Sequence, residues 1–302
     1  MRLLAVTLAL GVVGVTAIWT DALGVGSRWE SVLRRVDRFL AGPVPTRSSV
    51  PTVVVDDPTA EPTILPSPTP VLAPTPAGPA ATVVPSPAPT AAPTIARAPV
   101  DIRIAHDPEA VFAHQLTKDW CSPAAIQIVL ALHGRATTEP DFQREVAGRV
   151  REFESYADSH NGGWGPASMS EALAAYGVPG YEIHAYRTRE QALRGAAVAL
   201  MKTEAPVILL AWRGAHTWVM SGFRADADPR YFPDAVVSGT YILDPWYPSV
   251  SSIWGRSDPP GAFQDSAEMV RNYLPWKRPE GAYADRDGRF VVLVPTLPLA
   301  RV

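Results

Sequence analysis

A proline-rich segment divides this chain and limits what the residues on either side of it can fold into. Of the 302 residues, 32 are proline, about twice the ordinary share, and they concentrate between Pro43 and Pro99 among Thr, Ala, Val and Ser. Such a segment cannot bury enough apolar surface to fold, and proline favours extended backbone. We therefore predict a disordered linker over residues 43–99, reaching up to roughly 180 Å, and one folded domain over residues 100–302.

The residues after the linker have the composition of a folded domain. All nine Tyr and all but two of the nine Trp lie there, and roughly 200 residues are enough for a sizeable core. The net charge is −3, and Lys and Arg do not cluster with aromatic residues, so no nucleic-acid partner is expected. The single cysteine, Cys121, excludes a disulfide framework and a multi-cysteine zinc site. We expect no metal or other cofactor.

The N-terminus carries an apolar run directly behind Arg2. Residues 3–19 are seventeen residues without a charge, slightly short for a membrane-spanning helix and slightly long for the apolar part of a signal peptide. The small residues of Val15-Thr-Ala17 can serve as a cleavage site. We interpret residues 1–26 as a signal peptide or a transmembrane anchor, and the membrane as a partner of this segment.

A basic amphipathic helix is expected next, over residues 27–42. Its arginines Arg28, Arg34, Arg35 and Arg38 lie opposite apolar residues at helical spacing, so the helix can lie along a membrane surface or pack against a partner. These arginines favour the cytoplasmic side, whereas a Thr/Ser/Pro linker is common in extracytoplasmic spacers. We favour an extracytoplasmic domain, membrane-anchored or secreted.

Within the folded domain, helical patterns come first and strand patterns second. This order favours an α+β fold with an antiparallel sheet. The expected helices cover residues 122–133, 139–150, 168–176 and 188–202, and the expected strands cover residues 181–187, 206–212, 216–223, 241–244 and 290–295.

Cys121 lies directly before the first of these helices. Backbone N–H groups and the helix dipole stabilise negative charge there, which lowers the pKa of a thiol. A free cysteine is more often a small buried apolar residue, so Cys121 alone does not establish catalysis. His133, where this helix ends, is expected to be there as a cation beside the helix C-terminus.

His216 opens an apolar strand directly after the turn Arg213-Gly-Ala215. Cysteine chemistry needs a nearby base to maintain the thiolate and to protonate the leaving group, and His216 is the candidate. Asp244 ends the next strand before Pro245, where a carboxylate can hold the imidazole in one tautomer. An aspartate before proline is also a common turn residue.

Three further side chains are candidates for the same site. Gln115 precedes Cys121 by six residues and can donate its amide N–H to an oxyanion beside the Cys121 backbone N–H. Trp120, next to Cys121, and Trp164, in the loop Asn161-Gly-Gly-Trp-Gly165, are candidate substrate-binding residues. That loop is equally a flexible connection with one surface aromatic residue.

Taken together, these residues resemble one family. Gln115, the segment Asp119-Trp-Cys-Ser-Pro-Ala-Ala125, the His216 strand and the Asp244-Pro corner are similar to the papain-like cysteine peptidases that process bacteriocins at double-glycine leaders. The resemblance covers residues 100–302 and implies a papain-like fold, with N-terminal helices packed on an antiparallel sheet. It also implies Cys121 as nucleophile, His216 as general base and acid, Asp244 as its orienting group and Gln115 at the oxyanion.

Two departures from the family limit what the resemblance implies. Ser122 stands where many relatives have glycine, and the chain carries no membrane exporter, so cleavage of double-glycine leaders is not carried over. The expected function is hydrolysis of peptide or amide bonds in a peptide or protein. The alternatives are a peptidoglycan amidase or endopeptidase, although that class usually follows its cysteine with Ser-Gly rather than Ser122-Pro123, and a binding module that has lost its chemistry.

Overall fold

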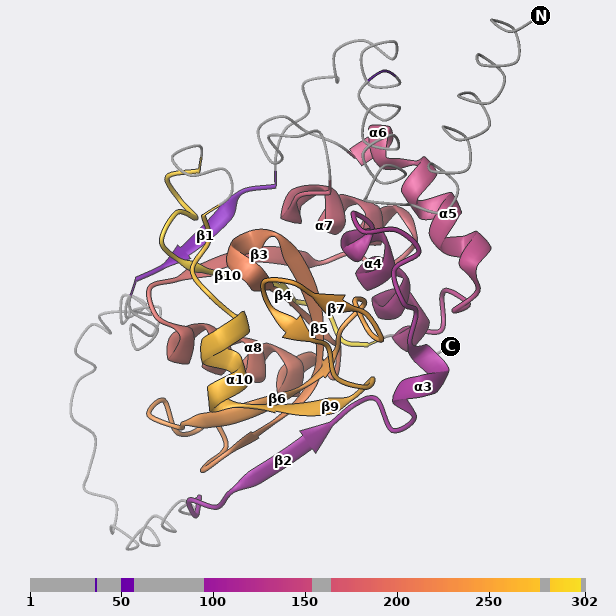
Figure 1. Ribbon diagram of the computed structural model, residues 1–302. Helices are drawn as coiled ribbons and strands as arrows, with labels where there is room; N and C mark the ends of the chain where they lie inside the picture. The colour runs from indigo at the N-terminus through magenta and orange to yellow at the C-terminus, as the bar shows by residue number, and fades with distance from the viewer. Residues whose placement is uncertain (1–35, 37–49, 57–94, 154–163, 278–282, 300–302) are drawn as a thin grey trace, which may run out of the picture. The chain divides into compact units, whose positions relative to one another are not determined.

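The computed structural model describes residues 36, 50–56, 95–153, 164–277 and 283–299 (Figure 1). The expected signal peptide or anchor at residues 1–26 lies outside these residues, as does the expected amphipathic helix except for Val36. None of the helices in the described ranges has the length and hydropathy needed to cross a membrane.

The fold is built on a large, mostly antiparallel sheet. Its strand order is β1-β3-β10-β4-β5-β6-β9, with β2 paired to β5, and the pairing of β1 with β3 is parallel. A separate hairpin pairs β7 with β8. The strands are β1 (Thr52–Val55), β2 (Val100–Arg103), β3 (Tyr181–Tyr186), β4 (Val207–Leu210), β5 (His216–Ala225), β6 (Val237–Leu243), β7 (Val250–Ser251), β8 (Gly255–Arg256), β9 (Ala262–Asp265) and β10 (Phe290–Pro295).

Helices cover both faces of this sheet. The bundle of α4 to α7 packs on one face, and α8 and α10 lie against the other (Figure 1). The helices are α3 (Pro108–Val111), α4 (Cys121–Leu132), α5 (Pro140–Gly148), α6 (Val150–Phe153), α7 (Pro166–Ala175), α8 (Arg189–Thr203), α9 (Ala211–Gly214) and α10 (Ser266–Asn272). The predicted α+β class is confirmed, and the second helical layer adds to the expected arrangement.

The two cores follow from the alternation of side chains along the central strands. In β10, Val291 and Leu293 join the core under α4 and α7, whereas Val292 and Val294 join the core under α8 and α10. Successive residues of a strand face opposite sides of the sheet. A strand buried on both sides therefore appears as a continuous apolar run, which is why the sequence predicted β4, β5 and β10 directly.

One predicted strand end is wrong. The apolar run from residue 206 was expected to continue as strand to Trp212, but β4 ends at Leu210. Trp212 and Arg213 have φ of 52° and 62° and Gly214 has φ of 82°, so the chain makes a left-handed turn there. The strands β2, β7, β8 and β9 and the helices α3, α6, α9 and α10 were not predicted.

The beginning of the folded domain also differs from the prediction. Residues 52–55, which we assigned to the disordered linker, form β1 at the edge of the sheet. The carboxylate of Asp56 accepts hydrogen bonds of 2.8 Å from both Arg187 and Arg289, and Arg286, whose side chain is buried, donates to Thr52 Oγ1 at 3.0 Å. The folded domain therefore includes residues on both sides of residues 57–94, which lie outside the described ranges.

Candidate active site

The thiol of Cys121 lies at the first residue of α4. The helix starts after Trp120, whose side chain makes no capping hydrogen bond, so the N–H groups of the first turn remain available to a negative charge. Pro123 suits this first turn because it lacks an N–H. Residues 122–130 are all buried, which fixes the helix, while Cys121 itself is partly exposed.

Strands β5 and β6 place an imidazole and a carboxylate next to each other. His216 begins β5 and Asp244 directly follows β6, and the two strands pair antiparallel. His216 Nε2 lies 2.6 Å from Asp244 Oδ1, and both side chains are buried. The same Oδ1 accepts a hydrogen bond of 2.9 Å from the backbone N–H of Trp246, which holds the carboxylate in this orientation.

The charges of Cys121 and His216 favour each other. Burial opposes ionisation of the Cys121 thiol, but the hydrogen bond and positive charge of His216, with the hydroxyls of Thr217 and Ser122, lower the pKa of Cys121 below its ordinary value. Burial likewise opposes protonation of His216, but Asp244 and Cys121 together raise the pKa of His216 to about 9. The two shifts favour a thiolate–imidazolium pair over a neutral thiol and imidazole.

These contacts give the two ring nitrogens of His216 different partners. Nε2 of His216 is engaged by Asp244, which leaves Nδ1 as the ring nitrogen for the sulfur of Cys121. The fold brings Cys121, His216 and Asp244 together from a helix start, a strand start and the end of a strand.

Gln115 lies next to this cluster, but its amide is oriented by a local contact. Its backbone N–H donates to the carbonyl of Pro245 at 2.8 Å, which ties it to the corner that carries Asp244. Its Nε2 donates to the carbonyl of Thr117 at 2.8 Å, and its Oε1 is buried without a partner among the described residues. The contact with Thr117 uses one of the two amide N–H groups of Gln115.

The two predicted substrate-binding tryptophans have different surroundings. Trp164 packs on the core of the α4–α7 layer, with its ring 6.0 Å from that of Phe153, and its carbonyl accepts a hydrogen bond of 3.3 Å from Ser122 Oγ. Trp120 is partly exposed at the cap of α4. Both therefore lie beside Cys121 in the chain or in space, and their role toward substrate remains a prediction.

Three tryptophan side chains that lie around His216 were not identified from the sequence. The ring of Trp212 stacks on that of His216 at 4.0 Å between centroids, and Trp246 presents its edge to the same imidazole at 6.4 Å. Trp254, from the β7–β8 hairpin, lies parallel to Trp212 at 5.8 Å. The position of Trp246 directly after Asp244-Pro245 was a signal that could have identified it, whereas the stacking of Trp212 depends on its left-handed turn.

His133 corrects a further expectation. It is buried at the end of α4 rather than exposed as a cation, and burial, with the nearby charge of Arg135, lowers the pKa of His133 to about 4. Its Nε2 is buried without a partner in the described part of the chain. His133 is therefore neutral at pH 7.

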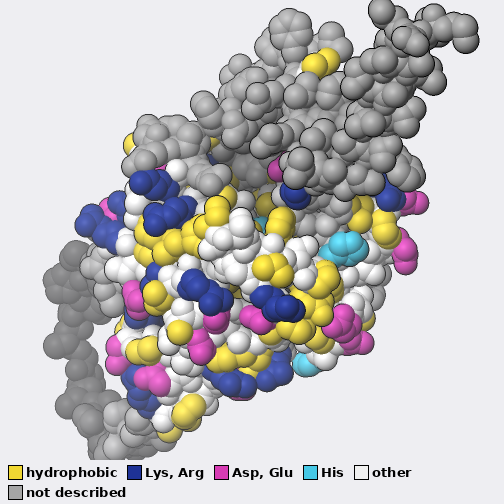
Figure 2. All heavy atoms as spheres, in the orientation of Figure 1, with side chains coloured by type: hydrophobic (Ala, Val, Ile, Leu, Met, Phe, Trp, Pro, Cys, Tyr) yellow, Lys and Arg dark blue, Asp and Glu magenta, His cyan; other side chains and the backbone are white. Residues whose placement is uncertain are grey.

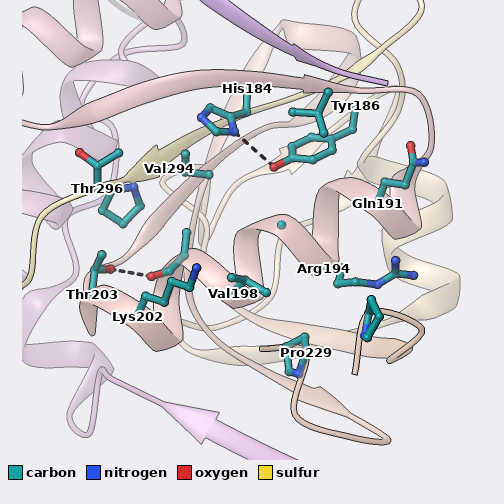
Figure 3. Close-up of a pocket in the computed structure, with 15 residues that line it drawn as sticks. His184, Tyr186, Gln191, Arg194, Val198, Lys202, Thr203, Pro229, Val294 and Thr296 are labelled. Atoms are coloured by element: carbon teal, nitrogen blue, oxygen red, sulfur yellow. Dashed lines mark hydrogen bonds between the residues drawn. The ribbon is translucent and has the colours of Figure 1, made fainter. Parts of the chain in front are cut away.

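The described residues also form a cavity away from the thiol of Cys121. A cavity of about 510 Å³ lies alongside α8, between this helix and side chains of β1, β3 and β10 (Figure 3). Tyr186 and His184, whose Oη and Nδ1 lie 3.3 Å apart, line one side of it, and Arg194 and Lys202 of α8 contribute cations.

On the face shown in Figure 2, basic and acidic side chains are interspersed among apolar ones.

Comparison with known proteins gives a family match and a similar solved structure. The family described as Peptidase_C39 like family matches residues 109–274, a range that contains Gln115, Cys121, His216 and Asp244. No curated protein sequence matches. A crystal structure of a double glycine motif protease from an AMS/PCAT transporter, in complex with the leader peptide, is 18% identical, covering 61% of this chain and 91% of its own with a TM-score of 0.32.

The α+β fold, with a thiol at a helix start beside an imidazole at a strand start, is that of a papain-like protein. The family match covers more than half of the chain. This protein belongs to the Peptidase_C39 like family, and the resemblance read from its motifs is confirmed.

Proposed function

We propose that this protein is a cysteine peptidase that hydrolyses peptide or amide bonds, with Cys121 as nucleophile. The observation that carries the proposal is the continuous contact from the thiol through His216 to Asp244, with the pKa of the thiol lowered and that of the imidazole raised to about 9. A thiolate paired with an imidazolium holds both the nucleophile and the proton that the leaving group requires.

In the first half of the reaction, the Cys121 thiolate attacks the carbonyl carbon of the scissile bond. The carbonyl oxygen takes the electron pair and is stabilised by the Cys121 backbone N–H and the free amide N–H of Gln115. When the C–N bond breaks, His216 gives its proton to the departing amine. The acyl group remains on Cys121 as a thioester.

In the second half, water replaces the amine. His216, now neutral, takes a proton from the water as its oxygen attacks the thioester carbonyl, and the thiolate of Cys121 leaves. The products are a carboxylic acid and the regenerated thiolate–imidazolium pair. Asp244 keeps Nε2 occupied in both halves, so that Nδ1 serves the reaction.

Full-length protein incubated with a mixed peptide library tests this proposal. We expect cleavage that is lost in Cys121→Ala and in His216→Ala, and a thioester-linked or alkylated Cys121 detectable by mass spectrometry. Purified peptidoglycan is incubated in parallel. Cleavage of peptidoglycan alone would replace the proposed substrate class, and absence of cleavage together with an ordinary alkylation rate of Cys121 would reject the enzyme in favour of a binding module.

We further propose that the domain is extracytoplasmic, with residues 1–26 as signal peptide or membrane anchor. The support is the uncharged run of residues 3–19 behind Arg2. Protease accessibility of the domain in intact cells tests its side of the membrane, and N-terminal sequencing of the mature protein tests cleavage. Protection of the domain until the cells are lysed would overturn the location.

A further inference from the structure

The backbone before His216 adopts a conformation that most residues avoid. Trp212 and Arg213 have φ of 52° and 62°, followed by Gly214 at 82°, and a non-glycine residue in this region is retained only where its surroundings enforce it. A Cβ at Gly214 would lie 2.4 Å from the ring of Trp276. The carbonyl of Arg213 accepts a hydrogen bond of 3.1 Å from Lys277. Contacts with Trp276 and Lys277 therefore fix the conformation of this turn.

The result of this turn is a buried indole with its own hydrogen bond. Trp212 is 9% exposed, and its Nε1 donates to Asn272 Oδ1 at 3.1 Å. Asn272 is also buried, and its Nδ2 donates to the backbone carbonyl and the side chain of Glu268 at 3.3 and 3.2 Å. These bonds tie the indole to α10 and leave it little freedom to rotate.

The indole in turn covers one face of the imidazole. Its ring lies 4.0 Å from that of His216 with 20° between the planes, and the edge of Trp246 closes another side at 84°. The hydrogen bond to Asp244 orients His216 within its ring plane, whereas the stacked indole determines the tilt of that plane. The π face of an indole also favours a cation at this position.

We propose that Trp212 is a positioning residue of the site, holding the plane of the His216 ring so that one nitrogen meets Asp244 and the other meets Cys121. The use of that second nitrogen in catalysis rests on the proposed function. The position of the ring does not, so the two can be tested separately. The strained turn at residues 212–214 is then the means by which the chain brings an indole onto an imidazole four residues away.

The test compares Trp212→Leu and Trp212→Phe in the full-length protein. The measured quantity is the rate of alkylation of Cys121 by iodoacetamide between pH 5 and pH 10, beside peptide cleavage. We expect Trp212→Leu to slow alkylation at pH 7 by about tenfold and to shift its pH dependence, because the imidazolium is less favoured. Trp212→Phe keeps an aromatic face and should retain most of the rate.

Trp218→Leu is the matched control. Trp218 is also buried, at 3% exposure, and lies on the same strand as His216 in the core under α8. It therefore reports the loss of a buried indole without loss of the stack. The proposal is overturned if folded Trp212→Leu alkylates like the parent, or if Trp218→Leu loses as much. Should Trp212→Leu not fold, Asn272→Ala decides by the same measurement: a slowed alkylation supports the proposal, and an unchanged one rejects it. A shifted alkylation profile without peptide cleavage would reject the proposed function and retain the positioning role.

Discussion

His216 Nε2 and Asp244 Oδ1 lie 2.6 Å apart although 28 positions separate the residues in the chain. The register of the sheet explains this, because Val219 pairs with Leu243 and so the start of β5 lies beside the end of β6. A hydrogen bond this short between an imidazole and a carboxylate is typical of a charged pair.

Asp244→Asn should therefore weaken the site more than any exposed aspartate would. Without the carboxylate charge, the pKa of His216 falls from about 9 and the imidazolium is lost at lower pH. We expect kcat/KM for peptide cleavage to fall on the order of 10²-fold. Asp141→Asn, which removes an exposed carboxylate paired with Arg144, is the control and should cleave at the parent rate. Equal rates in both variants would contradict a role for Asp244.

The pH dependence of cleavage should be bell-shaped. Activity rises as Cys121 ionises, at a pH below the ordinary thiol value of 9.0, and falls as His216 loses its proton at a pH of about 9. Measurement of kcat/KM from pH 5 to pH 10.5 checks both limbs. An activity that declines through pH 6.5 would show that His216 is not held as the cation.

Gln115→Ala tests the oxyanion contribution. A single donor at this position is worth about 10²–10³-fold in kcat, while substrate affinity should change little because the charge develops only during the reaction. Gln115→Glu is a useful companion, since it keeps the size and places a negative charge near the oxyanion. Wild-type kcat in Gln115→Ala would assign the oxyanion to backbone groups alone.

His133 should make the folded protein sensitive to acid. Its pKa is about 4 when folded, below the ordinary 6.5, so between these values the unfolded chain binds a proton that the folded chain does not. Stability then falls as pH falls from 6.5 toward 4, by up to about 1.4 kcal/mol per pH unit. Urea unfolding of His133→Leu across this range should show a shallower loss than the parent, and the exposed His106→Gln should not. Parallel curves for all three proteins would contradict the buried, neutral state.

The docking of β1 can be tested through Asp56. Asp56→Ala removes the shared acceptor of Arg187 and Arg289, so we expect hydrogen–deuterium exchange to rise severalfold at residues 52–55 and along β3, with β5 unchanged. Mass spectrometry of peptic fragments measures this. Unchanged exchange at residues 52–55 would show that the backbone pairing and Arg286 suffice to hold the strand.

The sequence predicted those features of the fold and site that depend on residues close together in the chain. Pro123 and the apolar face of α4, and the apolar runs of β5 and β10, are local patterns, and they located Cys121 and His216 on the correct elements. Their approach could be anticipated only from the requirements of thiol chemistry and from the family resemblance, because the sequence does not contain the register that joins β5 to β6.

The failures have physical reasons that a pattern does not contain. Trp212 ended an apolar run and was taken as strand, since side-chain type does not reveal a positive φ that Trp276 and Lys277 enforce from a distant segment. Residues 52–55 are β-branched, which favours strand, but their proline-rich surroundings outweighed this in the prediction. The arginines that hold Asp56 lie more than 130 positions later in the chain.

Strand β1 shortens the part of the proline-rich segment that can separate the folded domain from residues 1–42. Residues 57–94 follow β1 and precede β2 in the chain, and both strands belong to the same sheet. The length of this segment therefore does not add to the length of chain that connects the domain to residues 1–42. Only residues 43–51 form the connecting path, at most about 30 Å when fully extended, rather than the roughly 180 Å of a full-length spacer.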